Sequence, residues 1–320
     1  ISLLGKAKVL DSTVYYDLVI VGGGPAAMSA AVYAARKMLN CAVITRDFGG
    51  QVLETSEIEN WLGFQSINAR DLVDSFVEHV NNFDMAMASN VGVAAITKEG
   101  DIFRIETEDG NVYSARAVIL ATGKRHRPLD IPGEKDLVGR GVAYCATCDA
   151  PFFRDKTVVV VGGGNSAFTT AVDLLKVGAG VVMVNFIKGW QADEALQERV
   201  RKAEKVQFFD YHQVVRIEGK TSVEAVVIQK REKREERRLK AEGVFVEIGL
   251  VPNSESVKHL VALNELGEVV IDCSCSTNVE GFFGAGDVTT VPHKQIIISA
   301  GEGAKAALSA YDYLMKRSFV

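Results

Sequence analysis

The chain has 320 residues, of which 48% are hydrophobic, and carries a formal net charge of −5. This length favours two domains over one small core, and the acidic balance disfavours binding to nucleic acid or to an anionic membrane surface. The five cysteines, an odd number in a long chain, are untypical of a small secreted disulfide framework and favour a cytoplasmic, reducing environment.

The N-terminal segment shows no targeting signal. Residues 1–8 lack a long apolar stretch, and no apolar run in the chain reaches the roughly 18 to 20 residues that span a bilayer. We therefore expect a soluble protein with no membrane association.

A glycine-rich fingerprint follows the first predicted strand. The β-branched run 16–21 is typical of a buried parallel strand, residues 27–37 have the composition of a helix, and 41–45 predict the next strand. Between strand and helix, residues 22–27 fit Gly-x-Gly-x-x-Ala, in which the glycines let the backbone approach a pyrophosphate at the helix N-terminus. This βαβ unit predicts a dinucleotide site that contains Gly22, Gly24, Pro25 and Ala26.

The end of the second strand departs from the simplest form of this motif. An acidic residue commonly binds a ribose hydroxyl there, but the chain has Thr45 followed by Arg46. Ribose recognition must therefore differ.

A Cys-x-x-Cys pair, Cys145 and Cys148, lies just before a second fingerprint. Such a pair cycles between dithiol and disulfide, and a low thiolate pKa makes it reactive at neutral pH. An electron donor must reduce the disulfide back to the dithiol after each reaction. Dinucleotide sites on both sides of the pair therefore indicate an electron relay. A zinc site that combines the pair with Cys273 and Cys275 is disfavoured because the two pairs fall in different predicted domains, and we predict no metal.

The second fingerprint repeats the first unit. Strand 157–161 leads into Gly162–Ala167, followed by a predicted helix over 167–177 and a strand over 180–185. The repeat predicts an α/β fold with two Rossmann-like, three-layer ββα dinucleotide-binding domains. The residues predicted to bind the second dinucleotide include Gly162, Gly164, Asn165 and Ser166.

The C-terminal third contains two further patterns. The run 230–238 alternates in charge sign and predicts the solvated tip of a hairpin between strands 223–229 and 239–248, with a docking patch for an acidic partner as the alternative. A strand that ends in Gly284-Ala-Gly-Asp287 would place Asp287 against a ribityl or ribose hydroxyl.

Three cysteines remain outside the Cys-x-x-Cys pair. In a strand, Cys273 and Cys275 would point to the same face, close enough for a strained disulfide or half of a metal site. Buried or incidental thiols are the favoured interpretation of both and of Cys41.

Together these motifs resemble those of low-molecular-weight thioredoxin reductases over nearly the whole chain. The matching motifs, in order, are Gly22–Ala27, Gly49–Gln51, Ile58–Asn60, Ala121–Gly123, Cys145–Asp149, Gly162–Ala167, Gly249–Asn253, Gly284–Asp287 and Lys294–Gln295. Segments 48–53, 289–298 and 301–305 look even more like the flavoprotein subunit of alkyl hydroperoxide reductase. That subunit carries an additional thioredoxin-like N-terminal domain. Since only residues 1–15 precede the first predicted strand, we expect a stand-alone reductase.

The resemblance implies an FAD domain in two parts, residues 1–126 and 254–320, with an NAD(P)H-binding domain of residues 127–253 inserted between them. The inserted domain carries the Cys-x-x-Cys pair, and its rotation would bring either the disulfide or the nicotinamide to the isoalloxazine. The resemblance further implies that the residues binding FAD, besides those of the first fingerprint, are Thr45, Gly50, Gln51, Asn60, Ala121, Thr122, Gly123, Gly286, Asp287, Lys294, Gln295 and Ile296.

The resemblance also implies catalytic roles. Cys148 would be the thiol next to the flavin, Cys145 the thiol that attacks the partner disulfide, and Asp149 the general acid for the departing thiolate if burial raises its pKa. The predicted C-terminal helix, 301–315, would direct its N-terminus at the flavin. A flavin-tuning role for His293 and a surface position for His126 complete these expectations.

The residues expected to bind the nicotinamide dinucleotide depart from the family pattern. Thioredoxin reductases that use NADPH carry a basic cluster after the second strand of the inserted domain, because arginine binds the 2′-phosphate bidentately. Here the matching residues are Asn185, Phe186 and Ile187, with Gln191 at a further arginine position. We therefore expect NADH to be preferred over NADPH, with Asn185 bonded to the ribose and Lys188 open as a phosphate contact.

The sequence thus predicts an FAD-dependent disulfide reductase that passes electrons from NAD(P)H through Cys145 and Cys148 to thioredoxin or a glutaredoxin-like protein. We expect a homodimer, by analogy with the family. The alternatives are a dithiol oxidase that uses oxygen, a reductase fed by another electron donor, and a non-catalytic flavin-binding redox sensor.

Overall fold

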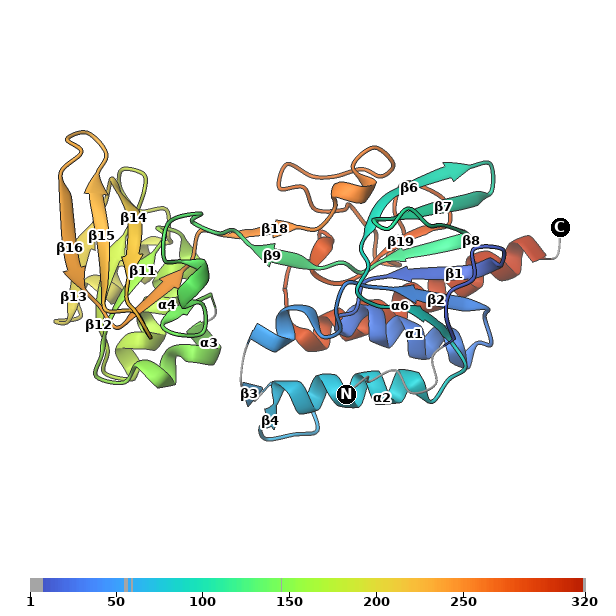
Figure 1. The fold of residues 1–320 in the computed structure, drawn as a ribbon, viewed down its shortest axis with the longest axis horizontal. Helices are drawn as coiled ribbons and strands as arrows, with labels where there is room; N and C mark the ends of the chain where they lie inside the picture. The colour runs from blue at the N-terminus through green and yellow to red at the C-terminus, as the bar shows by residue number, and fades with distance from the viewer. Residues whose placement is uncertain (1–7, 55–56, 59, 145, 319–320) are drawn as a thin grey trace. The chain divides into compact units, whose positions relative to one another are not determined.

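The computed structural model describes residues 8–54, 57–58, 60–144 and 146–318, which form two compact units (Figure 1). The first unit runs to Arg125 and resumes at Val251, and the second comprises His126–Leu250. The chain therefore leaves the first unit and returns to it. The two boundaries lie in β9 (Lys124–His126) and β18 (Leu250–Pro252), which pair as a two-stranded ribbon.

The first unit is built on a seven-stranded sheet. Its path runs β5-β2-β1-β8-β7-β6, and β19 pairs with β8. The pairs among β5, β2, β1, β8 and β19 are parallel, whereas β6, β7 and β8 form an antiparallel meander. The strands are β1 (Tyr15–Val21), β2 (Cys41–Ile44), β5 (Ala86–Ala88), β6 (Val93–Glu99), β7 (Ile102–Thr107), β8 (Val112–Leu120) and β19 (Phe282–Gly284).

Alternate residues of β1 serve two separate cores. Leu18 and Ile20 pack with α1 (Pro25–Arg36) and α6 (Ile296–Ser318), which cover one face of the sheet (Figure 1). Val19 and Val21 pack on the other side, with apolar residues of the meander. A strand buried on both faces needs an uninterrupted apolar run, which β1 supplies. A smaller cluster joins α2 (Ala69–Asn81) to the 3₁₀ turn η1 (Gly50–Glu54) and to the short strands β3 (Glu57–Ile58) and β4 (Ile67–Asn68).

The second unit has three layers. A parallel sheet of order β10-β17-β11-β12-β13 lies between helices and an antiparallel sheet of order β14-β15-β16. Val158 and Val160 pack with the helices, and Val159 and Val161 pack with the antiparallel sheet. The elements are β10 (Val142–Ala143), α3 (Ala146–Asp149), β11 (Thr157–Val161), α4 (Asn165–Lys176), β12 (Gly180–Val184), α5 (Glu194–Arg201), β13 (Val206–Phe209), β14 (His212–Glu218), β15 (Ala225–Lys230), β16 (Glu236–Lys240) and β17 (Gly243–Val246).

The predicted fold class is confirmed, because both fingerprints join a parallel strand to a helix in Rossmann-like layers. Among the helices of the described residues, none combines the length and the apolar character that crossing a bilayer requires.

Three local predictions are wrong. The predicted strand 239–248 is two strands in different sheets, β16 and β17, because the fully buried run Gly243–Val246 completes the parallel sheet instead of extending the hairpin. The C-terminal helix begins at Ile296, so Gly301 lies inside it. The charged hairpin tip is also shorter than predicted, because Lys230 ends β15 and Glu236 already pairs in β16.

Candidate functional site

The first fingerprint forms a tight turn between β1 and α1. Gly22 has φ +130°, and a Cβ there would lie 2.2 Å from the carbonyl oxygen of Ala121. A Cβ at Gly23 would lie 2.0 Å from the carbonyl oxygen of Asp47. At Gly24, by contrast, the only neighbouring atom within 4 Å would be 3.9 Å away. The backbone of Gly24, the N-cap residue of α1, is therefore not covered by neighbouring atoms, and Pro25 begins the helix. A pyrophosphate that binds at a helix N-terminus requires such an accessible backbone.

Loop residues approach this turn from the carboxyl ends of the neighbouring strands. The Gly49 N–H donates to the carbonyl of Gly23 at 2.8 Å, and Gly50, at φ +54°, lies against the Gly24 backbone. Gln51 donates through Nε2 to the backbone carbonyl of Lys124. Thr45 is buried, and its hydroxyl donates to the carbonyl of Asp47. The Thr45 hydroxyl is thus engaged within the turn.

After the chain returns to the first unit, it brings a second set of residues predicted to bind FAD to the same turn. A Cβ at Gly286, which has φ +74°, would lie 3.0 Å from the Ala26 Cβ. Asp287 follows directly, and Ser299 of α6 donates to its Oδ1 at 3.1 Å. Burial raises the pKa of Asp287, and the hydrogen bond from Ser299 opposes this shift. Ser299 had no signal in the sequence pattern.

Hydrogen bonds join two pairs of residues from distant motifs. Thr122 donates to the carbonyl of Asn253 at 2.6 Å, and the Asn253 amide donates back to the carbonyl of Thr122 at 2.8 Å. This fixes the segment that contains Ala121 and Gly123. Asn60 donates through Nδ2 to Oε1 of Gln295 at 3.0 Å, immediately before Ile296 begins α6.

A buried charge cluster that the sequence did not reveal lies in the first unit. Glu268 Oε1 is 2.6 Å from Lys124 Nζ and 3.4 Å from Lys294 Nζ, and these three side chains are 10 to 18% exposed. Lys294 also donates to the carbonyl of Thr289 at 2.6 Å. Burial and the charge of Lys124 lower the pKa of Lys294. Two lysines share one carboxylate here, and the electrostatic influence of both extends to Asp287.

The second fingerprint repeats the geometry of the first. Gly162 has φ +141°, and its Cβ would lie 2.3 Å from the carbonyl oxygen of Glu247. A Cβ at Gly163 would lie 2.4 Å from Asn185 Nδ2, whereas one at Gly164 would meet no atom within 4 Å. The third glycine again leaves open backbone at a helix N-terminus, here that of α4. Both turns therefore fit a dinucleotide pyrophosphate.

Side chains at the start of α4 bind other parts of the second unit. Asn165 exchanges two hydrogen bonds with Asp193, through its amide to Oδ2 at 3.1 Å and through Oδ1 from the backbone N–H at 2.7 Å. Ser166 and Thr170 both donate to the carboxylate of Glu247. Glu247, which the sequence patterns did not single out, thus anchors the helix behind the turn.

Asn185 lies beneath the second turn. It is 4% exposed, and its amide donates to the carbonyl of Gly189 at 2.6 Å and to Gln191 Oε1 at 3.1 Å. Gln191 in turn donates its backbone N–H to the carbonyl of Gly163 at 2.8 Å. The Asn185 amide therefore closes the loop that follows β12, which leaves only its carbonyl oxygen for a ribose hydroxyl.

The structure describes the Cys-x-x-Cys pair in part. Cys145 lies outside the described residues, and Cys148 belongs to α3, which ends at Asp149. Burial raises the pKa of Asp149 to about 6. This is the electrostatic condition for a carboxyl group that donates a proton near neutral pH.

A buried carboxylate fixes the backbone before α3. Glu134 is fully buried and accepts hydrogen bonds from the backbone N–H groups of Leu129 and Asp130, at 2.9 and 2.8 Å. It also accepts one at 3.0 Å from the hydroxyl of Tyr144, the residue before Cys145. The Tyr144 ring stacks on His126 with centroids 5.0 Å apart. His126 is thus packed against an aromatic ring and is not a plain surface side chain, whereas His293 is exposed.

The remaining thiols differ in their surroundings. Cys41, Cys273 and Cys275 are free, and the prediction that the last two share one face of a strand is wrong. They lie in a turn in which Cys275 has φ +63° and is buried, while Cys273 is exposed. Burial raises the pKa of Cys41 to about 12, and burial with a hydrogen bond to Glu302 raises that of Cys275. No group of three or more His, Cys, Asp or Glu side chains that could hold a metal ion occurs in the described residues.

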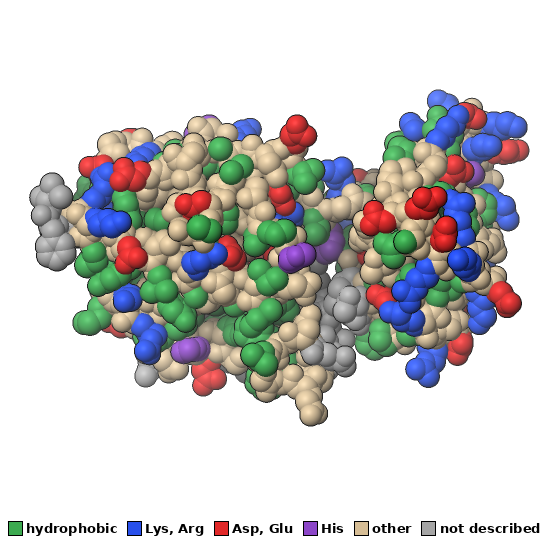
Figure 2. Space-filling view, turned by 180° about the vertical axis from the view of Figure 1, so that it is seen from behind, with side chains coloured by type: hydrophobic (Ala, Val, Ile, Leu, Met, Phe, Trp, Pro, Cys, Tyr) green, Lys and Arg blue, Asp and Glu red, His purple; other side chains and the backbone are tan. Residues whose placement is uncertain are grey.

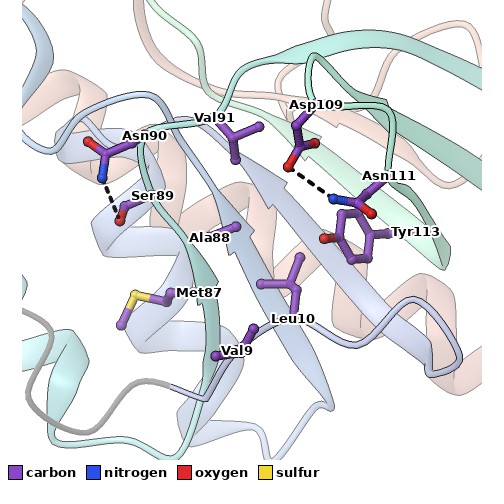
Figure 3. Close-up of a pocket in the computed structure, with 10 residues that line it drawn as sticks. All are labelled: Val9, Leu10, Met87, Ala88, Ser89, Asn90, Val91, Asp109, Asn111 and Tyr113. Carbon is purple, nitrogen blue, oxygen red and sulfur yellow. Dashed lines mark hydrogen bonds between the residues drawn. The ribbon is translucent and has the colours of Figure 1, made fainter.

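A surface hollow of about 450 Å³ lies elsewhere in the first unit (Figure 3). It is bordered by the segment of Val9 and Leu10, the end of β5 and the turn between β7 and β8, where Asn111 donates to Asp109 at 2.9 Å. None of the residues predicted to bind a cofactor lines it, and we assign it no role.

Comparison with known proteins places these sites in a family. Residues 16–307 match the model of the pyridine nucleotide-disulphide oxidoreductases. The chain is 42% identical over 301 residues to an NADH dehydrogenase of Bacillus subtilis (strain 168), and 40% identical over 316 residues to the F component of the alkyl hydroperoxide reductase of Escherichia coli (strain K12). These alignments cover 94 and 97% of this chain but only 59 and 60% of the relatives.

This chain also aligns with solved structures over nearly the whole length of the compared chains. Thioredoxin reductase from Streptococcus pyogenes MGAS5005 is 36% identical with a TM-score of 0.79, and that from Lactococcus lactis is 35% identical with a TM-score of 0.71. Each comparison covers 94% of this chain and 99% of the other. The family implies a flavin and a nicotinamide cofactor, for which the two turns are suited. The chain belongs to the pyridine nucleotide-disulphide oxidoreductase family, as a disulfide oxidoreductase similar to thioredoxin reductase and to the F component of alkyl hydroperoxide reductase.

Proposed function

We propose that this chain is an FAD-dependent reductase that takes electrons from NADH and passes them through Cys145 and Cys148 to the disulfide of a thioredoxin-like or glutaredoxin-like protein. The observation that carries the proposal is the pair of turns with bare third glycines, Gly24 and Gly164, in a chain that also holds a Cys-x-x-Cys pair. Two dinucleotide sites and one redox pair are the components of an electron relay.

The first unit would hold FAD through the turn around Gly24 and through the segment that contains Gly286 and Asp287. FAD supplies the chemistry of accepting a hydride and returning two electrons to a disulfide. The α1 N-terminus would bind the pyrophosphate, and the carboxylate of Asp287 would accept a hydroxyl hydrogen bond. The Lys124–Glu268–Lys294 cluster would place a net positive charge beside this segment and thereby favour a negatively charged ligand.

In the second unit, Asp149 would hold the proton that a departing thiolate requires. Its pKa of about 6 keeps part of the population protonated near neutral pH, and an ordinary aspartate would be almost fully ionised there. Glu134 and Tyr144 would fix the backbone on the other side of the pair. Cys148 would face the flavin and Cys145 the protein substrate.

The preference for NADH is supported by the residues after β12. The cation nearest to that strand end in sequence, Lys188, forms an ion pair with Glu232 at 3.1 Å, which balances its charge. The side chains at the family's basic positions are Asn185, Phe186 and Ile187, which offer no positive charge to a 2′-phosphate.

The proposal is tested by mixing the oxidised protein anaerobically with NADH and with NADPH, and following the loss of oxidised-flavin absorbance. NADH is expected to bleach the flavin, and NADPH to do so less efficiently. The Cys148→Ser variant should still be bleached but should not reduce a thioredoxin-type disulfide. Turnover by that variant would contradict the relay, and a flavin that neither nucleotide bleaches would favour a dithiol oxidase or another electron donor.

A further inference from the structure

The side chain of Phe186 stands at the edge of the second dinucleotide site. It follows Asn185, whose amide lies directly beneath Gly163, so Phe186 marks the carboxyl end of β12 next to the second turn. The residue is 49% exposed. In doubly wound sheets the adenosine ribose of a dinucleotide lies at this strand end, so the surroundings of Phe186 decide which adenosine can bind.

An arginine from a distant segment covers this ring. The Cζ atom of Arg231, in the turn between β15 and β16, lies 3.8 Å from the centroid of Phe186 and 5.2 Å from that of Tyr211. The backbone fixes this arrangement. Tyr211 N–H donates to the carbonyl of Ile187, and Arg231 N–H donates to the carbonyl of Tyr211, each at 3.2 Å. Three segments are thus joined, and the guanidinium is held on the ring.

The charges around this stack are unevenly balanced. Lys188 is paired with Glu232, and Asp210 accepts a hydrogen bond at 3.1 Å from the backbone N–H of Gly189. Among the described residues, no carboxylate forms an ion pair with Arg231. On the face of the second unit that Figure 2 shows, basic and acidic side chains are interspersed. Two cations lie over the Tyr211 ring, Lys188 and Arg231, and of these two only Lys188 has a carboxylate partner in the part of the chain that the structure describes.

We propose that Arg231, held over the ring of Phe186, binds the 2′-phosphate of NADPH and so makes NADPH a second, less efficient electron donor. The inference rests on the proposed function, because it places the nicotinamide donor in the second turn. A guanidinium binds phosphate in a planar, bidentate geometry, and stacking on an aromatic ring fixes its orientation before the ligand arrives. Sequence patterns at the family's basic positions miss this residue because it comes from the hairpin and not from the loop after β12.

The decisive experiment compares NADH and NADPH as donors for Arg231→Ala. Loss of a charge-assisted phosphate contact should lower kcat/KM for NADPH by about tenfold to a hundredfold, and kcat/KM for NADH should change by less than about threefold. Arg231→Lys should recover part of the NADPH activity, since a point charge remains without the planar contact. A wild-type protein that cannot use NADPH, or an Arg231→Ala variant that loses both donors equally, would overturn the proposal.

A binding measurement separates this inference from the proposed function. Adenosine 2′,5′-bisphosphate and AMP, titrated by calorimetry, need no electron transfer. We expect the bisphosphate to bind more tightly to the wild type and to lose that advantage in Arg231→Ala. The control is Arg201→Ala, which removes a similar stack, 5.8 Å from the Phe208 centroid, on the helical side of the sheet. Equal binding of the two nucleotides to the wild type, or an equal loss in the control, would contradict a role for Arg231.

Discussion

Single glycines distinguish what the fold requires from what a ligand requires. At Gly22, Gly23, Gly162 and Gly163 a side chain would collide with the protein's own atoms, so the fold alone accounts for them. Gly24 and Gly164 have no such neighbour within 3.5 Å, and their φ values of −82° and −91° suit any residue. The proposed dinucleotides, whose pyrophosphates would approach the backbone here, account for the absence of a side chain at these two positions.

Gly164→Ala tests this explanation. Because no atom lies within 4 Å of the new methyl group, the free energy of unfolding should change by less than about 0.5 kcal/mol. NADH binding should weaken by roughly tenfold or more, because the methyl group occupies the pyrophosphate approach. Thermal unfolding and calorimetric titration measure the two effects. Gly163→Ala, whose methyl group would clash with Asn185, should lose both stability and binding, and normal NADH binding by Gly164→Ala would contradict this explanation.

The raised pKa of Asp149 makes a prediction about pH. Between the ordinary value of 3.8 and the folded value of about 6, the folded protein keeps a proton that the unfolded chain releases. The free energy of unfolding therefore falls as the pH rises through this window and stays lower above it. Asp149→Asn cannot ionise, so above about pH 6 it should be more stable than the wild type, by about 1 kcal/mol after allowance for solvent screening.

The same variant should be a poor enzyme. Without a proton donor, the reduction of a disulfide substrate should slow by about a hundredfold or more, and flavin reduction by NADH should be unaffected. Chemical denaturation at several pH values and stopped-flow kinetics measure these effects. Asp136→Asn, at an exposed position, is the control. A parallel pH dependence of stability in the wild type and Asp149→Asn would show that Asp149 is not the titrating group.

At the scale of elements, α1 and α6 bring the two ends of the first unit together. Their facing surfaces are mostly alanine, including Ala27, Ala30, Ala306 and Ala310, all buried. Small side chains let the two backbones approach closely. The closest approach is at Gly303, where a Cβ would lie 1.9 Å from the carbonyl oxygen of Ala26. Since Ala26 belongs to the first turn, this contact aligns α6 with the predicted FAD site.

Gly303→Ala should force these helices apart. Overpacking against backbone should lower the free energy of unfolding by about 1 to 3 kcal/mol and release FAD more readily. The matched control is Gly301→Ala in the same helix, where no atom lies within 4 Å. This change should stabilise the helix by up to about 1 kcal/mol. Thermal unfolding with flavin fluorescence measures both effects, and equal melting temperatures for the two variants would contradict the packing argument.

The success of the sequence prediction depended on how local each signal was. Both strand–turn–helix units were predicted because glycine spacing and apolar runs report on neighbouring residues. The strand 239–248 was misjudged because only Ala241 and Glu242 separate β16 from β17, and only the register shows that the two strands belong to different sheets. The ion pair of Lys124 with Glu268, 144 residues apart, and the stack of Arg231 on Phe186 leave no local pattern. Burial of Asp149 likewise depends on tertiary packing.

At the scale of the whole molecule, each unit carries one glycine-rich strand–turn–helix fingerprint, and the second also carries the Cys-x-x-Cys pair. The antiparallel ribbon of β9 and β18 contains both chain crossings between the units. The chain matches solved thioredoxin reductases along 99% of their length, and about three fifths of the curated relatives. This arrangement supports the proposal that two bound dinucleotides and one dithiol act in series.

The most direct test of this relay is an anaerobic titration of the oxidised protein with NADH, in which electron equivalents and free thiols are counted together. FAD and a disulfide each accept two electrons, so the wild type should consume about two NADH per chain and gain two thiols. Cys148→Ser should consume about one and gain none. A wild type that consumes only one NADH and gains no thiols would contradict the transfer of electrons from the flavin to Cys145 and Cys148.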